Sequence, residues 1–187
     1  MGTHYFWALA FPQAVKQEMN EQLGEARKYF PFKRWVHLED FHITFAFLGS
    51  AEEQMLRRSI ELVGKAIEKE KEFPLRIQGL GVFGSRKSPR IFWASINQDD
   101  RLTYLQSLVF KACLESSFTL ESRPFAPHIT LARNWTGTEF DHKWLDTYNP
   151  FQKKPIPFTA NKVVLYKTNL EKIPKYEPIA TFSLISE

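Results

Sequence analysis

Two copies of one short motif carry the clearest chemical signal in this chain. Thr44 stands two positions after His42, and 86 residues further on Thr130 stands two positions after His128. Side chains two positions apart in an extended strand share a face, so each motif would place an imidazole beside a hydroxyl. An imidazole exchanges protons near neutral pH, and a hydroxyl donates hydrogen bonds to anionic oxygens. Two such pairs facing across a cleft would be suited to phosphoryl chemistry without a metal ion.

Hydrolysis of a ribose 2′,3′-cyclic phosphate needs catalytic groups on opposite sides of phosphorus. Water attacks in line with the departing oxygen, so one strand cannot hold both the base that activates water and the acid that protonates the leaving group. Two strands related by a pseudo-twofold axis can hold both. The paired motifs therefore predict His42 and His128 as the acid and the base, in either order. Thr44 and Thr130 would donate to the non-bridging oxygens, where negative charge gathers in the transition state.

The elements that must position these motifs recur in the same order in both halves of the chain. Apolar runs predict strands at about 4–11 and 90–97, and helical periodicity follows each of them. The motif strands come next, at about 41–48 and 127–133. Strand, helix and motif strand thus recur with an offset of 86 residues between the histidines, which indicates an internal duplication with little residual identity.

The remaining elements are predicted from caps and periodicity. Ser50 and Glu53 form a capping-box pattern before one helix, and Asp99 can cap another. The last part of the chain is predicted to hold an irregular loop, a short helix within it and two strands, at about 134–157, 140–147, 161–169 and 177–185.

Composition fits one folded domain and excludes several classes of protein. The chain has 187 residues, of which 43% are hydrophobic and 15% aromatic, which excludes a disordered segment. The formal net charge of +4 is compatible with an anionic substrate without indicating one. The single cysteine, Cys113, excludes an internal disulfide, and no apolar run is long enough to span a membrane. We expect a cytoplasmic monomer.

The paired motifs and their flanks resemble the 2H phosphoesterase superfamily, which is named for two His-x-Thr motifs. The chain is most similar to the branch called RNA 2′,3′-cyclic phosphodiesterases, also described as 2′-5′ RNA ligase-like. Either motif alone is a weak signal, whereas two in a duplicated context are a specific one. The resemblance covers nearly the whole chain, and its main segments are residues 6–9, 35–36, 42–49, 83–94 and 124–133.

The resemblance implies a fold as well as an activity. It implies a two-lobed, pseudo-twofold α+β fold in which antiparallel sheets line a central cleft and helices pack outside. Residues 1–187 would form this single domain, with halves at about 1–80 and 81–187. The same four motif residues would act on the phosphate, with no cofactor and no metal.

Two positions outside the motifs also bear on the function. Arg133 stands where this branch often carries a basic residue, and the resemblance places it on the substrate. In a regular strand it would share a face with Leu131, so it reaches the cleft only if the strand ends or bends there. Lys167 and Thr168 stand where relatives often carry Glu and Ser, a departure that bears on substrate preference and ligase-like activity.

The expected function is metal-independent hydrolysis of a 2′,3′-cyclic phosphate, on an RNA end or a nucleotide, to a 2′-phosphate. A second interpretation is reversible 2′-5′ RNA linkage chemistry at the same site, which microscopic reversibility allows. A third is a non-catalytic module that binds RNA or nucleotides. Assays on cyclic phosphates and on 2′-5′ linkages, and binding after loss of both histidines, would separate the three.

Other side chains are open to two interpretations. The pairs Lys33-Arg34 and Arg86-Lys87 are candidate phosphate contacts, and solvated charge pairs are as plausible. A tryptophan near the cleft could stack on a base, worth ~1–3 kcal/mol per base, and the candidates are Trp35, Trp93 and Trp135. Core packing is expected for Phe41, Phe45, Phe47 and Phe125, and surface or core-edge positions for His4, His37 and His142.

Overall fold

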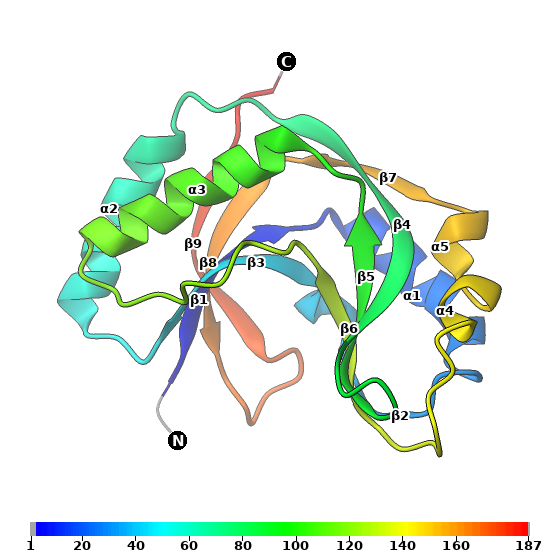
Figure 1. Ribbon diagram of the computed structural model, residues 1–187. Coiled ribbons are helices and arrows are strands. Elements are labelled where there is room, and N and C mark those ends of the chain that lie inside the picture. Colours follow the sequence, from blue (N-terminus) through cyan, green and yellow to red (C-terminus); the bar gives the residue numbers. More distant parts are fainter. Residues whose placement is uncertain (1–2, 187) are drawn as a thin grey trace.

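Two motif strands form the centre of one antiparallel sheet, and the computed structural model describes residues 3–186. These strands are β3 (His42–Gly49) and β6 (Ile129–Trp135), which meet where Ile43 pairs with Ile129. The other strands are β1 (Tyr5–Ala10), β2 (Phe32–Trp35), β4 (Phe73–Gly84), β5 (Pro89–Ile96), β7 (Ile156–Ala160), β8 (Lys162–Thr168) and β9 (Tyr176–Ser183). The order is β7-β4-β5-β6-β3-β1-β8-β9, and β2 pairs with β6 off this path (Figure 1).

Helices pack outside the sheet in two groups (Figure 1). In one group, α2 (Glu53–Ile67) and α3 (Asp100–Glu115) pack against each other, and α3 also packs on β3. The other group consists of α1 (Gln13–Ala26), α4 (Trp144–Thr147) and α5 (Pro150–Lys153), which lie against β4 and β7. A 3-10 helix, η1 (Leu38–Asp40), leads directly into β3. No helix within residues 3–186 combines the length and apolar character needed to cross a membrane.

Along the main path each lobe takes one motif strand and three further strands, and β2 adds a ninth strand beside β6. The first lobe is β3-β1-β8-β9 and the second is β6-β5-β4-β7, so the order outward from the centre corresponds in the two lobes. The α+β class and the two-lobed arrangement expected from the sequence are confirmed, with the predicted sheets joined into one. The first lobe combines strands from early and late in the sequence. β8 and β9 come last in the chain order but complete the lobe that holds β1. A division of the domain near residue 80, which lies inside β4, stays a prediction.

The six strands predicted by range are confirmed to within two residues at each end. Asp99 caps α3 as expected, because its carboxylate accepts a hydrogen bond from the Arg101 N–H at 2.9 Å. The capping box predicted from Ser50 and Glu53 is wrong. The residue that precedes α2 is Glu52, and no side chain caps that helix.

The segment predicted as a loop over 134–157 contains more structure than expected. It holds both short helices, and its end opens β7. Two prolines, Pro155 and Pro157, concealed this strand. An edge strand tolerates proline because the N–H that faces away from the sheet needs no partner, and β7 is the edge of the second lobe.

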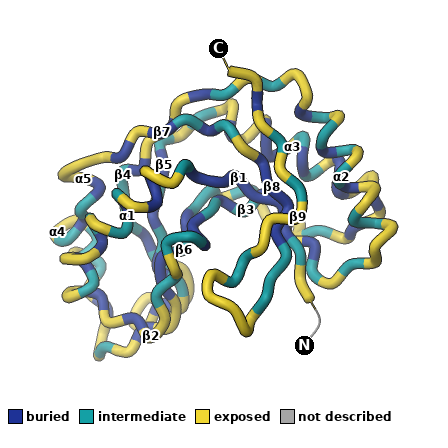
Figure 2. The backbone as a smooth tube through the Cα atoms, turned by 180° about the vertical axis from the view of Figure 1, so that it is seen from behind, coloured by how far each residue is buried: buried dark blue, intermediate teal, exposed yellow. Residues whose placement is uncertain are grey.

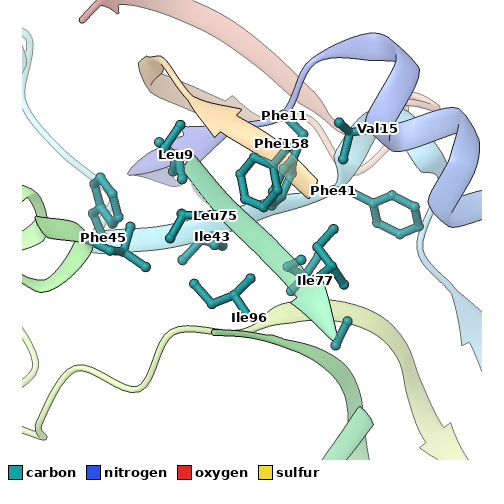
Figure 3. Close-up of a cluster of buried hydrophobic side chains, with 14 of the residues drawn as sticks. Leu9, Phe11, Val15, Phe41, Ile43, Phe45, Leu75, Ile77, Ile96 and Phe158 are labelled. Carbon is teal, nitrogen blue, oxygen red and sulfur yellow. The ribbon is translucent and has the colours of Figure 1, made fainter. Parts of the chain in front are cut away.

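Apolar side chains from both lobes form one large core (Figure 3), and β1 and β8 share a second, smaller buried cluster. Leu9, Ile43, Leu75 and Phe158 come from four different strands and are all buried there. Successive side chains of a strand point to opposite faces, so burial of Ile43 turns its two neighbours in the motif away from the core. Figure 2 shows burial along the backbone, with many buried residues in the central strands and many exposed residues on the outer helices.

Asp40, the last residue of η1, holds the loop between β8 and β9. Its side chain is buried, and its carboxylate accepts hydrogen bonds from the backbone N–H of Lys175 at 3.0 Å and of Tyr176 at 3.1 Å. Hydrogen bonds to an ionised acceptor are roughly twice as strong as neutral ones. This carboxylate therefore fixes a late segment of the chain beside the start of β3.

We expect Asp40→Ala to lower the free energy of unfolding by about 1.5–3 kcal/mol, because backbone donors lose a charged acceptor. Asp40→Asn keeps one acceptor oxygen and should lose less. Urea unfolding measures both variants, and amide hydrogen exchange at Lys175 and Tyr176 shows where the structure opens. An alanine variant with wild-type stability and unchanged exchange at these two amides would contradict the role given to Asp40.

Candidate active site

A cleft of about 600 Å³ lies where the two motif strands meet. All five residues predicted from the sequence line it, namely His42, Thr44, His128, Thr130 and Arg133. They come from two strands that are distant in the chain and adjacent in the sheet. The structure therefore brings the predicted residues together in one place.

His42 is held in one tautomer by the backbone. Its Nδ1 lies 2.7 Å from the carbonyl oxygen of Asp40, and because a carbonyl can only accept, Nδ1 carries the proton and donates. In the neutral ring Nε2 is then an acceptor, and the Thr44 hydroxyl lies 3.0 Å from it. The rings of Phe6 and Tyr176 enclose the imidazole, with centroids 4.7 and 5.2 Å away.

His128 repeats this arrangement from the other motif. Its Nδ1 lies 2.8 Å from the carbonyl oxygen of Ala126, again two residues earlier in the chain. Nε2 is therefore the atom left for a substrate. The rings beside it are Phe83 and Trp93, with centroids 5.0 and 6.3 Å from that of the imidazole. Each histidine thus has a fixed tautomer and an aromatic wall.

Burial lowers the pKa of both histidines. Desolvation is the main cause for His42 and lowers its pKa to about 4, with smaller contributions from the charges of His128 and Arg133. The pKa of His128 is also lowered, first by burial and then by Arg133. The bonds to the Asp40 and Ala126 carbonyls act in the opposite direction, and so does the negative charge of the Asp40 carboxylate beside His42. Both imidazoles are therefore neutral in the free protein at pH 7.

A β-bulge explains how Arg133 reaches the cleft. In the pairing of β6 with β5, Thr130 and Ala132 lie opposite neighbouring residues, so Leu131 is an extra residue. Leu131 and Ala132 are both fully buried, and the alternation of faces shifts by one position. Arg133 consequently lies on the face of Thr130 and lines the cleft. The condition that the strand must bend there is met.

The same bulge occurs in β3 and corrects one prediction. Thr44 and Ala46 lie opposite neighbouring residues of β1, which leaves Phe45 as the extra residue. Phe47 then falls on the cleft face, where it is 55% exposed, so its predicted place in the core is wrong. The offset of 86 residues maps Phe47 onto Arg133. That correspondence was the signal in the sequence that could have identified Phe47.

Positive charge surrounds the cleft. Lys33, Arg34, Arg133 and Lys175 line it, and Asp40 is the one carboxylate among its described lining residues. Backbone N–H groups donate hydrogen bonds to that one carboxylate, and four cations face a single anionic side chain. A cleft lined by positive charges raises the local concentration of anionic ligands. The arrangement therefore suits an anion.

Other side chains considered from the sequence are now placed. Lys33 and Arg34 line the cleft. Lys87 does not line it and forms an ion pair with Glu139, with 3.3 Å between Nζ and Oε1. Of the three candidate tryptophans, Trp35 lines the cleft, Trp93 flanks His128, and Trp135 is buried. Among residues 3–186, no three His, Cys, Asp or Glu side chains are close enough to hold a metal ion.

Comparison with solved structures shows the same fold. The E. coli LigT structure in its apo form superimposes with a TM-score of 0.73 over 97% of each chain at 22% identity. A second E. coli LigT structure, complexed with 3′-AMP, gives a TM-score of 0.74 and covers 98% of this chain and 99% of the other, also at 22% identity.

Sequence comparison identifies the family. Residues 9–93 and 95–176 match the model for LigT-like phosphoesterases. A Geobacillus stearothermophilus protein named RNA 2′,3′-cyclic phosphodiesterase is 40% identical over 98% of this chain, which spans 58% of that relative's length. A Bacillus subtilis protein of the same name is 30% identical over 97% of this chain and 96% of its own. The family expected from the paired motifs is confirmed, and the chain belongs to the LigT-like phosphoesterases.

Proposed function

We propose that this chain hydrolyses 2′,3′-cyclic phosphates, on RNA ends or nucleotides, to 2′-phosphates by metal-independent acid–base catalysis. One observation carries the proposal. Two histidines, each held through Nδ1 by a carbonyl two residues earlier and each followed by a threonine, line one cationic cleft. The name RNA 2′,3′-cyclic phosphodiesterase, given to two relatives, supports this substrate class.

The reaction uses the two Nε2 atoms in opposite roles. One histidine accepts a proton from water as the water oxygen bonds to phosphorus. The other donates a proton to O3′ as the bond between phosphorus and O3′ breaks, which leaves a 2′-phosphate. Thr44, Thr130 and Arg133 donate to the non-bridging oxygens, where charge gathers in the transition state. In the free protein the Thr44 hydroxyl is engaged by His42, so phosphate binding redirects it.

We expect His42→Ala and His128→Ala each to lower kcat by ~10²–10⁴, the usual contribution of one acid or base. Phosphorus NMR with 2′,3′-cyclic AMP and EDTA present measures turnover and shows whether the product is the 2′-phosphate. Circular dichroism confirms folding, and His→Gln variants replace any alanine variant that does not fold. Near wild-type turnover in either variant would overturn the mechanism. Loss of wild-type activity in EDTA would overturn metal independence.

A substrate with sulfur in place of O3′ distinguishes the acid from the base. A thiolate has a far lower pKa than an alkoxide and leaves without protonation. We expect one histidine-to-alanine variant to recover most of its activity on the 3′-S-bridging cyclic phosphorothiolate, which identifies the acid. The other variant should stay inactive. Recovery of both variants, or of neither, would contradict separate roles for His42 and His128.

The lowered pKa values predict an acidic optimum for kcat/KM. Catalysis needs one imidazole neutral and the other protonated, and this state is most populated between the two pKa values. The pKa of His42 is about 4, and that of His128 is lowered from 6.5. The rate should therefore rise through pH 4 and fall before pH 7. Arg133→Gln removes a positive charge that lowers both pKa values, so both limbs should move to higher pH. Limbs that stay in place or move to lower pH would contradict this electrostatic link.

Reversible 2′-5′ linkage chemistry and binding without turnover remain the alternative outcomes. Cleavage of 2′-5′-linked dinucleotides, with no hydrolysis of cyclic phosphates, would replace the proposal by the first. Tight binding of the 2′-phosphate product by a protein that turns over neither substrate would replace it by the second.

A further inference from the structure

The strand β2 adds a second group of cations to the cleft, one that the acid–base step does not use. Arg34 lies directly opposite Arg133 in the antiparallel pair of β2 and β6. Residues in such a pair have Cβ atoms ~4.5–5.5 Å apart and share a face of the sheet. Lys33, the preceding residue, also lines the cleft. Lys33 and Arg34 are exposed, and no hydrogen bond or ion pair to either side chain is found within residues 3–186.

This placement of like charges is unfavourable in the free protein. Like charges directly opposite in a sheet destabilise it. Elsewhere several exposed arginines lie beside carboxylates, such as Arg57 with Glu53 and Arg123 with Glu121. Among the described residues no carboxylate forms an ion pair with Arg34 or Arg133, so an anion from outside is the group that would offset their repulsion.

The position of Arg34 indicates which anion. The reacting phosphate meets the motif residues and Arg133, and Arg34 lies one strand further out. In an RNA chain the next negative charge is the phosphodiester on the 5′ side of the terminal nucleotide. Trp35 follows Arg34 and also lines the cleft. Cations beside an aromatic ring are typical of sites for single-stranded nucleic acid.

We propose that Lys33 and Arg34, beside Arg133, bind the phosphodiester that precedes the terminal nucleotide. The protein then prefers oligonucleotides that end in a 2′,3′-cyclic phosphate to cyclic mononucleotides. This inference rests on the proposed function and adds to it a second subsite, for the phosphodiester one nucleotide upstream. A competing account is that these charges protect the edge of a four-residue strand against pairing with another chain.

Three substrates isolate the contribution of the phosphodiester. They are 2′,3′-cyclic AMP, the dinucleotide ApA ending in a cyclic phosphate, and the same dinucleotide with a neutral methylphosphonate linkage. The wild type should show a kcat/KM for the charged dinucleotide about tenfold or more above that for the neutral one, since a hydrogen bond to a charged group is lost. The neutral dinucleotide controls for the additional nucleoside.

Arg34→Gln should lower the ratio of kcat/KM for charged over neutral dinucleotide by about tenfold. It should also reduce the slope of log KM against log salt by ~0.7, the value for one phosphate contact on a single strand. Arg57→Gln on α2 removes the same charge outside the cleft and should leave both quantities unchanged. Because Arg34→Gln relieves repulsion, its melting temperature should equal or exceed that of the wild type.

Two results would overturn the inference. One is a wild type that does not distinguish the charged from the neutral dinucleotide, and the other is an Arg34→Gln variant that retains the wild-type ratio, as edge protection requires. Failure of the proposed function is a different result, in which no cyclic phosphate is hydrolysed at all. Calorimetry with the linear dinucleotide that ends in a 2′-phosphate then still tests the inference. Arg34→Gln should lower the affinity for this dinucleotide about tenfold and should lower the affinity for its methylphosphonate analogue much less.

Discussion

The contact between β3 and β6 is the constraint on which the rest of the structure depends. Ile43 and Ile129 pair across it, and both are fully buried. Because side chains alternate along a strand, burial of these two residues turns the histidine and threonine of each motif to the opposite face. A shift of one residue in either strand would bury an imidazole and expose an isoleucine. The free energy of core packing therefore also maintains the geometry of the site.

The two bulges make a duplicated structure chemically unequal. Each bulge shifts the alternation after its motif, so that a residue expected in the core faces the cleft instead. That residue is Phe47 in one lobe and Arg133 in the other. The symmetric part of the cleft thus holds the two acid–base groups, while its flanks differ in charge and polarity. A bound chain would therefore have a defined direction across the cleft.

Local sequence patterns predicted most of the fold. The features that they did not predict depend on contacts between residues far apart in the chain. Alternation and helical periodicity located the strands and the two His-x-Thr motifs, because burial acts on each residue separately. A bulge depends on the partner strand, so strand parity alone placed Arg133 on the wrong face and gave no sign of Phe47. The bond from Asp40 to the loop before β9 joins residues 135 apart in the chain and has no local signature. The capping box at Ser50 failed because a pattern of residue types does not fix the residue at which a helix begins.

The combination of early and late strands in the first lobe has a consequence for how this protein is made. β1 emerges from the ribosome well before β8, which begins at Lys162 and is one of its two hydrogen-bonded neighbours. Until that segment is synthesised, a strand with Trp7 and Leu9 among its residues has an open edge, the kind of surface that pairs with other chains. Contacts of such sequence separation also slow folding. The edge of β1 is therefore covered only after most of this sequence has been synthesised.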